Sequence, residues 1–379
     1  MRKNKIRILH VAQAAGGVDR YIRMLLKYLD KEKFENILVC SQDFHRKDYD
    51  GLADSFEQVE MNRAIGVNDL KSIEKVRKLI KKYKPNIVYA HSSKAGAIAR
   101  MADIGLKNYC IYNPHGWAFN MRCSKKKKMM YIVIEKIAAF FCDKIICISD
   151  AEKESALKKK ICKEEKLQVI FNGIDIDAYE RRVHGRIKRI DLDIPEDAFV
   201  VGMVGRISPQ KAPDVFIKMA KLIKNEIPNA HFVIVGNGEQ ESEIREFAEN
   251  NGFLDRLHIT GWVDDPMSYV EIFDVACLLS RWEGFGLVLP EYMIARKPIV
   301  ATKVDAIPNI IRDGENGFLI EADDIDGASK AVLKLYGKNK LKEDLVNQGI
   351  EDIYNDFDVK RVAVEHEKLF LSVKVLNEM

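Results

Sequence analysis

The sequence predicts an α/β protein built from two doubly wound domains that face each other across a cleft. Short β-branched apolar runs alternate with longer amphipathic segments along nearly the whole chain, which is typical of βαβ units and parallel sheets. The 379 residues amount to about two and a half domains of roughly 150 residues. Residues 172–194 form a polar stretch of weak periodicity that indicates a linker. We therefore expect an N-terminal domain over residues 1–172 and a C-terminal domain over residues 173–359.

The expected strands are the short apolar runs, and helices are expected between them. Ser149, followed three residues later by Glu152, is a capping box that begins one helix. Pro213 is a favourable first residue for a helix over residues 214–225. The strands are expected at residues 6–12, 37–40, 87–90, 110–113, 144–148 and 168–171, and at residues 199–204, 231–235, 257–260, 275–279, 298–301 and 317–320.

The composition is that of an ordinary globular protein. With 47% hydrophobic and 31% charged residues, it excludes wholesale disorder, a collagen-like chain and a polytopic membrane protein. The seven cysteines show no C-x-x-C spacing, so we expect reduced thiols and a cytoplasmic protein. The first residues predict a strand and not a secretory signal. The longest apolar stretch, residues 129–142, contains Glu135 and Lys136 and is shorter than the roughly 20 residues of a spanning helix.

The net charge of +4 hides two oppositely charged halves. Residues 1–190 contain 40 basic and 23 acidic side chains, a net charge of +17, whereas residues 191–379 contain 21 and 34, a net charge of −13. The two halves are therefore expected to face different partners. Nucleic acid is not expected to be one of them, because the basic half lacks interleaved aromatic residues or a known binding motif.

Gly16 and Gly17 follow the first strand and open a helix. They could let backbone amides approach an anion at the helix N-terminus. The G-x-G-x-x-G pattern of dinucleotide-binding proteins is absent. From this loop alone, a tight turn without a ligand is an equal alternative.

Arg206 and Lys211 follow the first strand of the second domain, and Gly236 ends the next strand. An arginine can bind two phosphate oxygens at once and a lysine adds a mobile charge, so the pair suits a diphosphate. Gly236 and Gly238 would let the backbone approach the same ligand. Solvated surface charges and a plain turn are the alternatives for these residues taken alone.

The segment SRWEGFGLVLPEYMIA, residues 280–295, carries the clearest chemical pattern. Glu283 ends a strand, Gly284 and Gly286 free the backbone of a loop, and Glu291 lies eight residues after Glu283 on a short helix. A carboxylate can accept two neighbouring hydroxyl protons, so each glutamate suits a vicinal diol, one on a sugar and one on a ribose. The amides of residues 284–287 can point at phosphate oxygens.

Taken in order along nearly the whole chain, these motifs resemble the retaining, nucleotide-sugar-dependent glycosyltransferases of family 4, which have the GT-B fold of two Rossmann-like domains. The resemblance is carried by E-x7-E with its EGFG core, by GRxxxxK at residues 205–211, by the GG loop and by NGID at residues 172–175. The segments HSSKAGAIAR, residues 91–100, and HGWAF, residues 115–119, further resemble the branch that builds bacterial capsule, exopolysaccharide and lipid-linked oligosaccharides.

The resemblance implies a role for each motif residue. Arg206 and Lys211 would bind the donor diphosphate and stabilise charge on the leaving group. Glu283 would hold the donor sugar and Glu291 the ribose. His115 matches a family histidine beside the donor sugar, and His91 is a further candidate there. The implied donor-binding residues also include Gly284, Phe285, Gly286, Leu287, Val263 beside the base, Gly236, Gly16 and Gly17.

The implied reaction moves a sugar, with retention, from a UDP-sugar to a polyprenyl-pyrophosphate-linked saccharide. The leaving phosphate takes the acceptor's proton, so no protein base is needed, and the sequence has no Ser-His-Asp elbow. No cofactor and no divalent metal is implied, because the cleft loops show no obvious D-x-D motif; the D-x-D pattern of Asp175 and Asp177 lies in the linker. The family also implies a final helix at residues 360–379 that packs back onto the first domain.

Two questions stay open from the residues. The lysine run at residues 125–128 precedes the apolar segment MMYIVIEKIAAFF, which suits either an anionic membrane surface or a core-facing helix with a solvated lysine cap. The first alternative would place the protein peripherally at the inner face of the cell membrane. For the activity, the alternatives are a non-hydrolysing nucleotide-sugar epimerase of the same fold and a non-catalytic nucleotide-sugar-binding protein.

Overall fold

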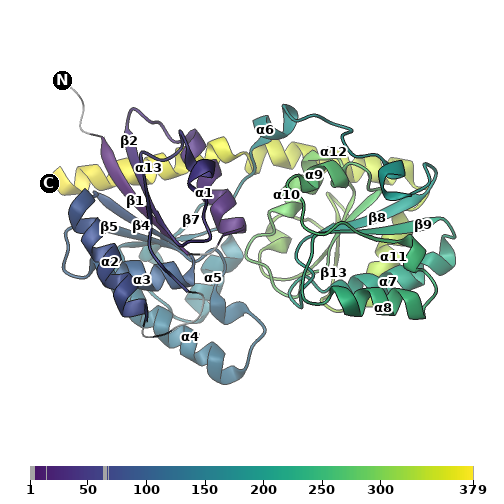
Figure 1. Ribbon diagram of the computed structural model, residues 1–379, viewed down its shortest axis with the longest axis horizontal. Helices are drawn as coiled ribbons and strands as arrows, with labels where there is room; N and C mark the ends of the chain where they lie inside the picture. Colours follow the sequence, from purple (N-terminus) through teal and green to yellow (C-terminus); the bar gives the residue numbers. More distant parts are fainter. Residues whose placement is uncertain (1–4, 14, 63–65, 67, 379) are drawn as a thin grey trace. The chain divides into compact units, whose positions relative to one another are not determined.

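The computed structural model describes residues 5–13, 15–62, 66 and 68–378, and the chain divides into two compact units (Figure 1). Unit 1 consists of Met1–Asp175 and Asp358–Met379, and unit 2 consists of Ile176–Phe357. The chain therefore leaves unit 1 once and returns to it for its last helix. The units change at Asp175 and Asp358, a few residues from the boundaries at 172 and 360 that the sequence indicates.

Within the described residues, unit 1 contains a seven-stranded sheet in the order β3-β2-β1-β4-β5-β6-β7. Every neighbouring pair is parallel. The strands are β1 Ile6–Ala12, β2 Phe34–Cys40, β3 Ser55–Gln58, β4 Ile87–His91, β5 Tyr109–Asn113, β6 Lys144–Cys147 and β7 Leu167–Val169. The order reverses at β1, since β2 pairs with one side of β1 and β4 with the other.

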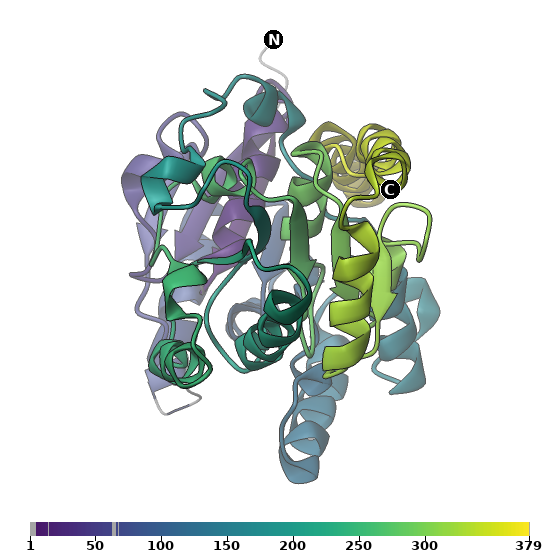
Figure 2. The same cartoon turned by 90° about the vertical axis from the view of Figure 1, so that its right-hand side faces the viewer.

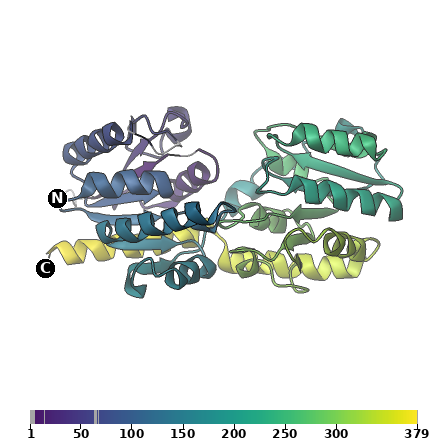
Figure 3. The ribbon, with the colours of Figure 1, turned by 90° about the horizontal axis from the view of Figure 1, so that it is seen from below.

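Helices cover both faces of this sheet. Successive residues of a strand point to opposite faces, so Ile8 of β1 joins the core beneath α1 and α13, whereas Leu9 joins the core beneath α2 and α3. Figure 3 shows α13 in yellow along the sheet, with Val362 and Phe370 buried in its core. The helices are α1 Gly17–Tyr28, α2 Asn68–Tyr83, α3 Ser93–Asp103, α4 Lys125–Ala138, α5 Asp150–Lys158 and α13 Val359–Glu378, with 3-10 turns η1 Arg46–Tyr49, η2 Ala118–Asn120, η3 Ala139–Phe141 and η4 Glu164–Lys166.

Unit 2 contains a six-stranded sheet in the order β10-β9-β8-β11-β12-β13, again with parallel pairs. Helices lie on both sides of it (Figure 2). The strands are β8 Phe199–Val204, β9 Ala230–Val235, β10 Leu257–Ile259, β11 Val275–Leu278, β12 Ile299–Thr302 and β13 Phe318–Ile320. The helices are α6 Ile176–Glu180, α7 Pro213–Glu226, α8 Glu241–Asn250, α9 Pro266–Val270, α10 Val288–Ile294, α11 Ile325–Leu335 and α12 Asn339–Asp356, with turns η5 Arg189–Leu192, η6 Leu254–Arg256 and η7 Ile307–Asn309.

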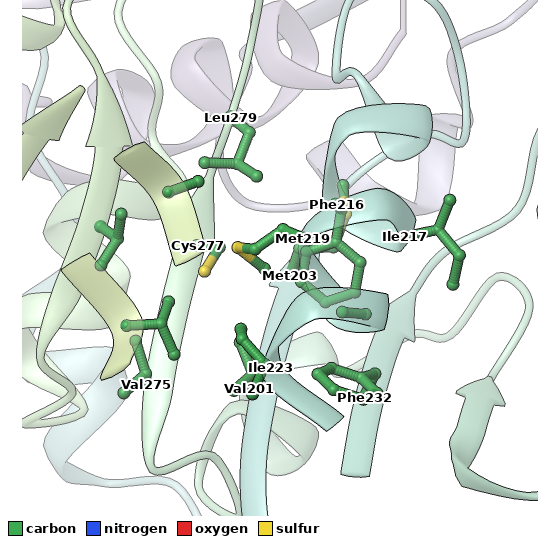
Figure 4. Close-up of a cluster of buried hydrophobic side chains, with 14 of the residues drawn as sticks. Val201, Met203, Phe216, Ile217, Met219, Ile223, Phe232, Val275, Cys277 and Leu279 are labelled. Atoms are coloured by element: carbon green, nitrogen blue, oxygen red, sulfur yellow. The ribbon is translucent and has the colours of Figure 1, made fainter. Parts of the chain in front are cut away.

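The core of unit 2 fixes α7 over the centre of its sheet. Figure 4 shows side chains of α7 among those of β8, β9 and β11. Phe216, Met219 and Ile223 of α7 are buried, and they recur at spacings of three and four along the helix. The buried strand residues beside them include Val201, Met203, Phe232, Val275 and Cys277. This packing sets the position of the loop that leads from β8 into α7.

The predicted fold class is confirmed, because each unit is a doubly wound, Rossmann-like parallel sheet. Ser149 is the N-cap of α5 and accepts a hydrogen bond from the Glu152 N–H at 3.2 Å, and α7 begins at Pro213. Strand β3 was not predicted. Its sequence, SFEQ, is mostly polar because β3 lies at the edge of the sheet with only Phe56 buried.

Most of the expected linker is bound to unit 2. The Arg182 guanidinium donates to Asp265 at 2.8 Å, and the Gly185 N–H donates to Glu271 at 2.6 Å. Polar groups of residues 172–194, which in the sequence indicate a solvated linker, are thus paired with carboxylates of unit 2. The part after Asp175 therefore belongs to the second unit as a folded segment.

Candidate active site

The candidate donor residues of unit 2 lie at the carboxyl ends of its strands, around the point where the strand order reverses. β8 pairs with β9 on one side and with β11 on the other. Loops that leave such neighbouring strands in opposite directions open a crevice in which α/β sheets usually bind ligands. The β8–α7 loop, residues 205–212, contains Arg206 and Lys211, and the β11–α10 loop, residues 279–287, contains Glu283.

Lys211 and Glu283 form an ion pair that joins these two loops. Both side chains are mostly shielded from solvent. The Ser280 hydroxyl donates to the same Glu283 oxygen at 3.2 Å, and the Glu283 N–H donates to the Asp305 carboxylate at 2.8 Å. The carboxylate of Glu283 is therefore held in place from two sides, and the Lys211 ammonium, with three N–H donors, retains the capacity to bind further oxygens.

Arg281 fastens the same two loops from the other side. Its side chain donates to Asp214 at 2.7 Å, to Asp323 at 2.6 Å and to the Pro209 carbonyl at 2.9 Å. Its backbone N–H donates to the Gln210 carbonyl at 2.8 Å. The hydrogen bond to Asp214 raises the pKa of Arg281, so this side chain stays charged and positions the loop that carries Lys211.

Arg206 occupies a different environment from Lys211. Its side chain is 63% exposed and pairs with Glu239 at 3.3 Å. The structure therefore brings Lys211 together with Glu283, and Arg206 together with a glutamate at the end of the β9 loop. An exposed guanidinium in this place is free to turn toward an anion, because a surface ion pair contributes little to stability.

Gly236 has a structural reason to be glycine. Its φ is +142°, and a Cβ added there would lie 2.2 Å from the Gly205 carbonyl oxygen. The backbones after β8 and β9 thus approach each other too closely for any side chain. Gly236 also forms a bridge with Gly261, which precedes the half-buried Val263. The predicted base-binding residue therefore lies beside the loop that follows β9.

The β11–α10 loop and α10 are anchored by their side chains. Phe285 is buried and packs edge-to-face against Phe357, with 6.0 Å between the ring centroids. Gly286 adopts a φ of +82° that favours glycine. Gly284 precedes this anchor, and Leu287 is the N-cap of α10. Glu291, on the helix α10 that follows, is buried.

Tyr292 ties α10 to the strand end at the site. Its hydroxyl oxygen accepts a hydrogen bond from the Val204 N–H at 2.8 Å, and Val204 is the last residue of β8. The buried carboxylate of Glu291 lies near the start of the same helix, where the helix dipole favours a negative charge. The sequence-predicted residues Glu283 and Glu291 are therefore carried by neighbouring elements of one rigid support.

In unit 1, the GG loop and the two candidate histidines lie at the end of β1, β4 and β5. Gly16 is the N-cap of α1, with a φ of +109°, and a Cβ added at Gly16 or Gly17 would meet nothing within 4 Å. Both glycines are exposed, so the start of α1 is open on that side. His115 has a φ of +50°, held by the hydrogen bond from its N–H to the Asn113 side chain at 2.9 Å.

His115 is the end of a buried chain of hydrogen-bonded rings. His115 Nε2 lies 3.1 Å from His91 Nδ1, and His91 Nε2 lies 3.2 Å from His10 Nδ1. His10 Nε2 lies 3.2 Å from the Asn36 side-chain oxygen. With that oxygen as the acceptor, each ring carries its proton on Nε2, because a neutral imidazole has one donor and one acceptor. Nδ1 of His115 then remains an acceptor.

Burial keeps these rings neutral. It lowers the pKa of His10 to about 4 and that of His115 to about 3, and it lowers the pKa of His91 as well. His366 of α13 joins the cluster, 2.9 Å from the Tyr21 hydroxyl and 3.0 Å from that of Tyr89, and burial lowers its pKa to about 4. His10 and His366 carry no sequence motif and were not predicted, since they meet the cluster only through the fold.

Among the described residues, no group of three or more His, Cys, Asp and Glu side chains is placed to hold a metal ion. In the same part of the chain, no helix is long and apolar enough to cross a bilayer.

Comparison with known proteins assigns the class that this geometry indicates. A family model described as Glycosyltransferase Family 4 matches residues 15–178, and one described as Glycosyl transferases group 1 matches residues 186–352. HepE of Anabaena, solved in complex with UDP and glucose, has the same fold, with a TM-score of 0.84 over 97% of this chain and 100% of its own at 20% identity. The two Rossmann-like units and their strand-end loops thus define a GT-B glycosyltransferase.

Relatives over the whole length specify the family. The UDP-Gal:alpha-D-GlcNAc-diphosphoundecaprenol alpha-1,3-galactosyltransferase of Escherichia coli is 30% identical over 381 residues, which cover 98% of both chains. The capsular polysaccharide biosynthesis glycosyltransferase CapM of Staphylococcus aureus is 27% identical over 96% of both chains. The chain belongs to the GT-B glycosyltransferases of family 4.

Proposed function

We propose that the protein is a retaining glycosyltransferase that moves a sugar from a UDP-sugar to a polyprenyl-diphosphate-linked saccharide during the synthesis of a capsular or extracellular polysaccharide. The E. coli relative is named for a UDP-galactose donor and a diphosphoundecaprenol-linked acceptor, and the S. aureus relative is named for capsule synthesis. A lipid-linked acceptor would bring the reaction to a membrane, and we propose its cytoplasmic face. The proposal extends these features to this chain.

The observation that carries the proposal is the Lys211–Glu283 pair at the strand-order reversal of unit 2. A cation and a carboxylate held side by side match a sugar diphosphate, in which anionic phosphate oxygens lie next to sugar hydroxyls. Lys211 would bind the phosphate oxygens while Glu283 accepts hydrogen bonds from the donor sugar. Glu291 would accept from the ribose hydroxyls, and Val263 would contact the base.

The proposed chemistry needs charge stabilisation more than proton transfer by the protein. The bond between the sugar and the diphosphate breaks as the acceptor oxygen attacks from the same face, and the acceptor's proton goes to the leaving phosphate oxygen. The products are UDP and an extended saccharide with the donor's anomeric configuration. Lys211, Arg206 and the amides of Phe285, Gly286 and Leu287 would stabilise the negative charge that develops on the diphosphate.

His115 would act as a neutral hydrogen-bond acceptor in this scheme. Its Nδ1 is the free end of the histidine chain, so it can accept from a hydroxyl of the donor sugar. The amides at Gly16 and Gly17 would approach a charged group of the bound substrates from the start of α1. The cations of the protein would replace a divalent metal, so transfer is expected to continue in excess EDTA.

The test is a transfer assay with the full-length protein. UDP-galactose, UDP-glucose and UDP-N-acetylglucosamine are each incubated with GlcNAc-diphosphoundecaprenol, and the products are separated and analysed by NMR. The proposal predicts UDP release that depends on acceptor, and an α-linked product. A β-linked product would contradict retention. Conversion of a UDP-sugar to its epimer without acceptor would indicate the epimerase, and binding without turnover would indicate the non-catalytic alternative.

A further inference from the structure

The histidine chain of unit 1 crosses four neighbouring strands of its sheet. Asn36 lies on β2, His10 on β1, His91 at the end of β4 and His115 two residues after β5, and these strands follow one another in the sheet in that order. Contacts of 3.2, 3.2 and 3.1 Å join the four side chains in sequence. The histidine chain thus connects the interior of the sheet with the strand ends at the candidate site.

The histidine chain lies on a face of the sheet that is otherwise mostly apolar. Side chains alternate along a strand, so His10 shares its face with Ile8, and His91 shares its face with Tyr89, in the core beneath α1 and α13. His10 and His91 have no exposed surface, and Asn36 is 1% exposed. Burial of a polar ring costs free energy that hydrogen bonds only offset. An apolar side chain would avoid this cost, so the arrangement indicates a role other than stability.

Close packing holds each ring in one orientation. His10 and His91 stack at an interplanar angle of 14°, and His91 and His115 stack at 26°, with 5.4 Å between the ring centroids in both pairs. Tyr89 packs against His91 with a centroid distance of 4.1 Å, and Tyr21 packs edge-on against His115 at 4.6 Å. Each ring therefore keeps the same nitrogen toward its neighbour.

One end of the histidine chain determines where every ring carries its proton. A neutral imidazole has one N–H donor and one acceptor nitrogen. Rings linked from Nε2 to Nδ1 can therefore carry their protons either all on Nε2 or all on Nδ1. The side-chain oxygen of Asn36 can only accept, so it selects Nε2–H on His10, and through His10 on His91 and His115. The nitrogen at the open end, Nδ1 of His115, is then an acceptor.

The histidine chain is not suited to carry protons away from the site. A proton that enters at His115 would have to leave at Asn36, whose side-chain amide is buried and neutral. Moving all three ring protons to Nδ1 would also place the lone pair of His10 Nε2 against the Asn36 oxygen, and a hydrogen bond would be lost. The arrangement therefore favours one state of the rings.

We propose that Asn36, His10 and His91 are positioning residues that keep Nδ1 of His115 as a hydrogen-bond acceptor for a hydroxyl of the donor sugar. The inference rests on the proposed function for its substrate and deepens it, because it assigns the proton position of His115 to an asparagine two rings away. His91 is fully buried, so it acts through His115 and not by direct contact. An acceptor nitrogen selects a hydroxyl, which can donate, over an ether oxygen or a carboxylate, which cannot.

The first measurement is the tautomer of each ring in the full-length protein without substrate. Long-range proton–nitrogen NMR of the protein with nitrogen-15-labelled histidine distinguishes a protonated ring nitrogen from a bare one, and single histidine variants assign the signals. In wild type at neutral pH, we expect Nε2–H on His10, His91 and His115. A proton on Nδ1 of any of these rings overturns the proposal.

His10→Leu removes the acceptor of His91 and should change the tautomers of the rings that remain. His91 would otherwise bury an N–H without a partner, so His91 and His115 should move to Nδ1–H or to a mixture of both forms. Asn36→Leu should have the same effect, because it removes the oxygen that selects Nε2–H. Unchanged tautomers in both folded variants overturn the proposal.

Two substitutions at position 10 separate positioning from packing. His10→Gln offers both a donor and an acceptor and can continue the hydrogen bonds, whereas His10→Leu offers neither. We expect kcat for sugar transfer to fall about tenfold in His10→Leu and to stay within about threefold of wild type in His10→Gln. Thermal melting should show His10→Leu to be at least as stable as His10→Gln, because the surrounding core is apolar. Transfer by His10→Leu at or above the rate of His10→Gln overturns the proposal.

A second pair of stacked histidines provides the matched control. In unit 2, His231 Nδ1 lies 2.9 Å from His258 Nε2, with 5.2 Å between the ring centroids. His231 is near the start of β9, at the opposite end of the strand from Gly236. His231→Leu should therefore transfer sugar at the wild-type rate. An equal loss of kcat in His231→Leu and His10→Leu overturns the proposal, because it indicates a general cost of losing a histidine pair.

The two kinds of measurement separate this inference from the proposed function. The tautomers are observed without substrate, so a wild type that has the expected tautomers but transfers no sugar contradicts the function alone. A wild type that transfers sugar but carries the proton of His115 on Nδ1 contradicts the positioning alone.

Discussion

Glu283 illustrates how single residues make the candidate site. Its carboxylate meets Lys211, which lies 72 residues earlier in the chain, and its backbone N–H meets Asp305. The first contact sets up charge complementarity toward a sugar diphosphate, and the second fixes the loop that presents it. The side chain thus has a partner that is distant in the sequence, and its backbone is fixed by a second one.

Replacing Glu283 by Ala should lower kcat for sugar transfer by roughly 100-fold or more, because a contact to the reacting sugar is lost. The melting temperature should fall only modestly, since the pair lies in loops outside the hydrophobic core, although Lys211 loses a partner that is mostly shielded from solvent. Steady-state kinetics and thermal melting measure the two effects. Asp344→Ala, which removes a carboxylate from a surface ion pair with Lys340 on α12, is the control and should leave both unchanged. A Glu283→Ala enzyme of normal rate would refute the site.

The motif residues of the candidate site could be predicted from the sequence, but the residues that hold them in position could not. Glu283 and Glu291 stand in a recognisable local spacing, so they could be predicted together. Asp305 lies 22 residues after Glu283 and has no pattern of its own. His366 reaches Tyr21 from 345 residues away. Contacts of this kind depend on which strands become neighbours, which the local sequence does not encode.

Among the elements, the β8–α7 and β11–α10 loops form one support because Arg281 joins them. It bonds to the start of α7 through Asp214 and to the β8–α7 loop through the Pro209 carbonyl. In the proposed reaction, Arg281 acts neither as a base nor as a cation that binds the diphosphate. Its part is to position Lys211 relative to Glu283.

Arg281→Met keeps the side-chain length and removes these bonds. We expect it to raise KM for the donor several-fold, and to cost about 1–3 kcal/mol of stability because Asp214 and Asp323 lose a charged partner. Kinetics with varied UDP-sugar and chemical denaturation measure these effects. Arg245→Met, at a surface ion pair with Glu241 on α8, is the matched control. Equal behaviour of the two variants would show that Arg281 has no positioning role.

The elements themselves were largely predictable, with two instructive exceptions. Strand β8 is a continuous apolar run because both faces of its sheet are covered by helices. The edge strand β3 lacks that signal. For α4, the sequence left two orientations open, since lysines followed by apolar residues suit either. The burial of Glu135 against Arg100 shows which side of α4 faces the core, and such a pairing is visible only in three dimensions.

At the scale of the whole molecule, unit 1 should respond more strongly to acid than unit 2, where burial also lowers the pKa of His231 and of His258. Unit 1 buries His10, His91 and His366 and partly buries His115, and this burial holds the pKa values of all four well below 6.5. The unfolded chain takes up protons on these residues near pH 6.5 and the folded chain does not. The stability present above that pH is therefore lost as pH falls toward 4. Asp103, whose pKa burial raises to about 6, opposes this with a single group.

The free energy of unfolding should accordingly fall between pH 7 and pH 5, by on the order of 1–2 kcal/mol for each of the buried histidines. Thermal melting followed by circular dichroism at the two pH values measures it, and the lower-melting transition should belong to unit 1. A melting temperature that is equal or higher at pH 5 would contradict the neutral, buried histidine cluster.

The division of charge between the halves of the chain has a counterpart in the two units. The basic half supplies α4 with its lysines, and the acidic half holds Lys211 and Arg206 as local cations among carboxylates. Composition predicts only that the halves differ. The position of each charge on its unit determines whether it suits a lipid surface or a nucleotide diphosphate.

The most direct test of the central claim, that a nucleotide-sugar donor binds at the end of β8 and β11 in unit 2, is calorimetric titration of UDP into the full-length protein. Wild type and the surface control Lys340→Ala should bind UDP with the same dissociation constant. Lys211→Ala should bind at least about tenfold more weakly, because it loses a charge-assisted bond to the diphosphate. Binding of UDP to Lys211→Ala with the affinity of the wild type would contradict the account.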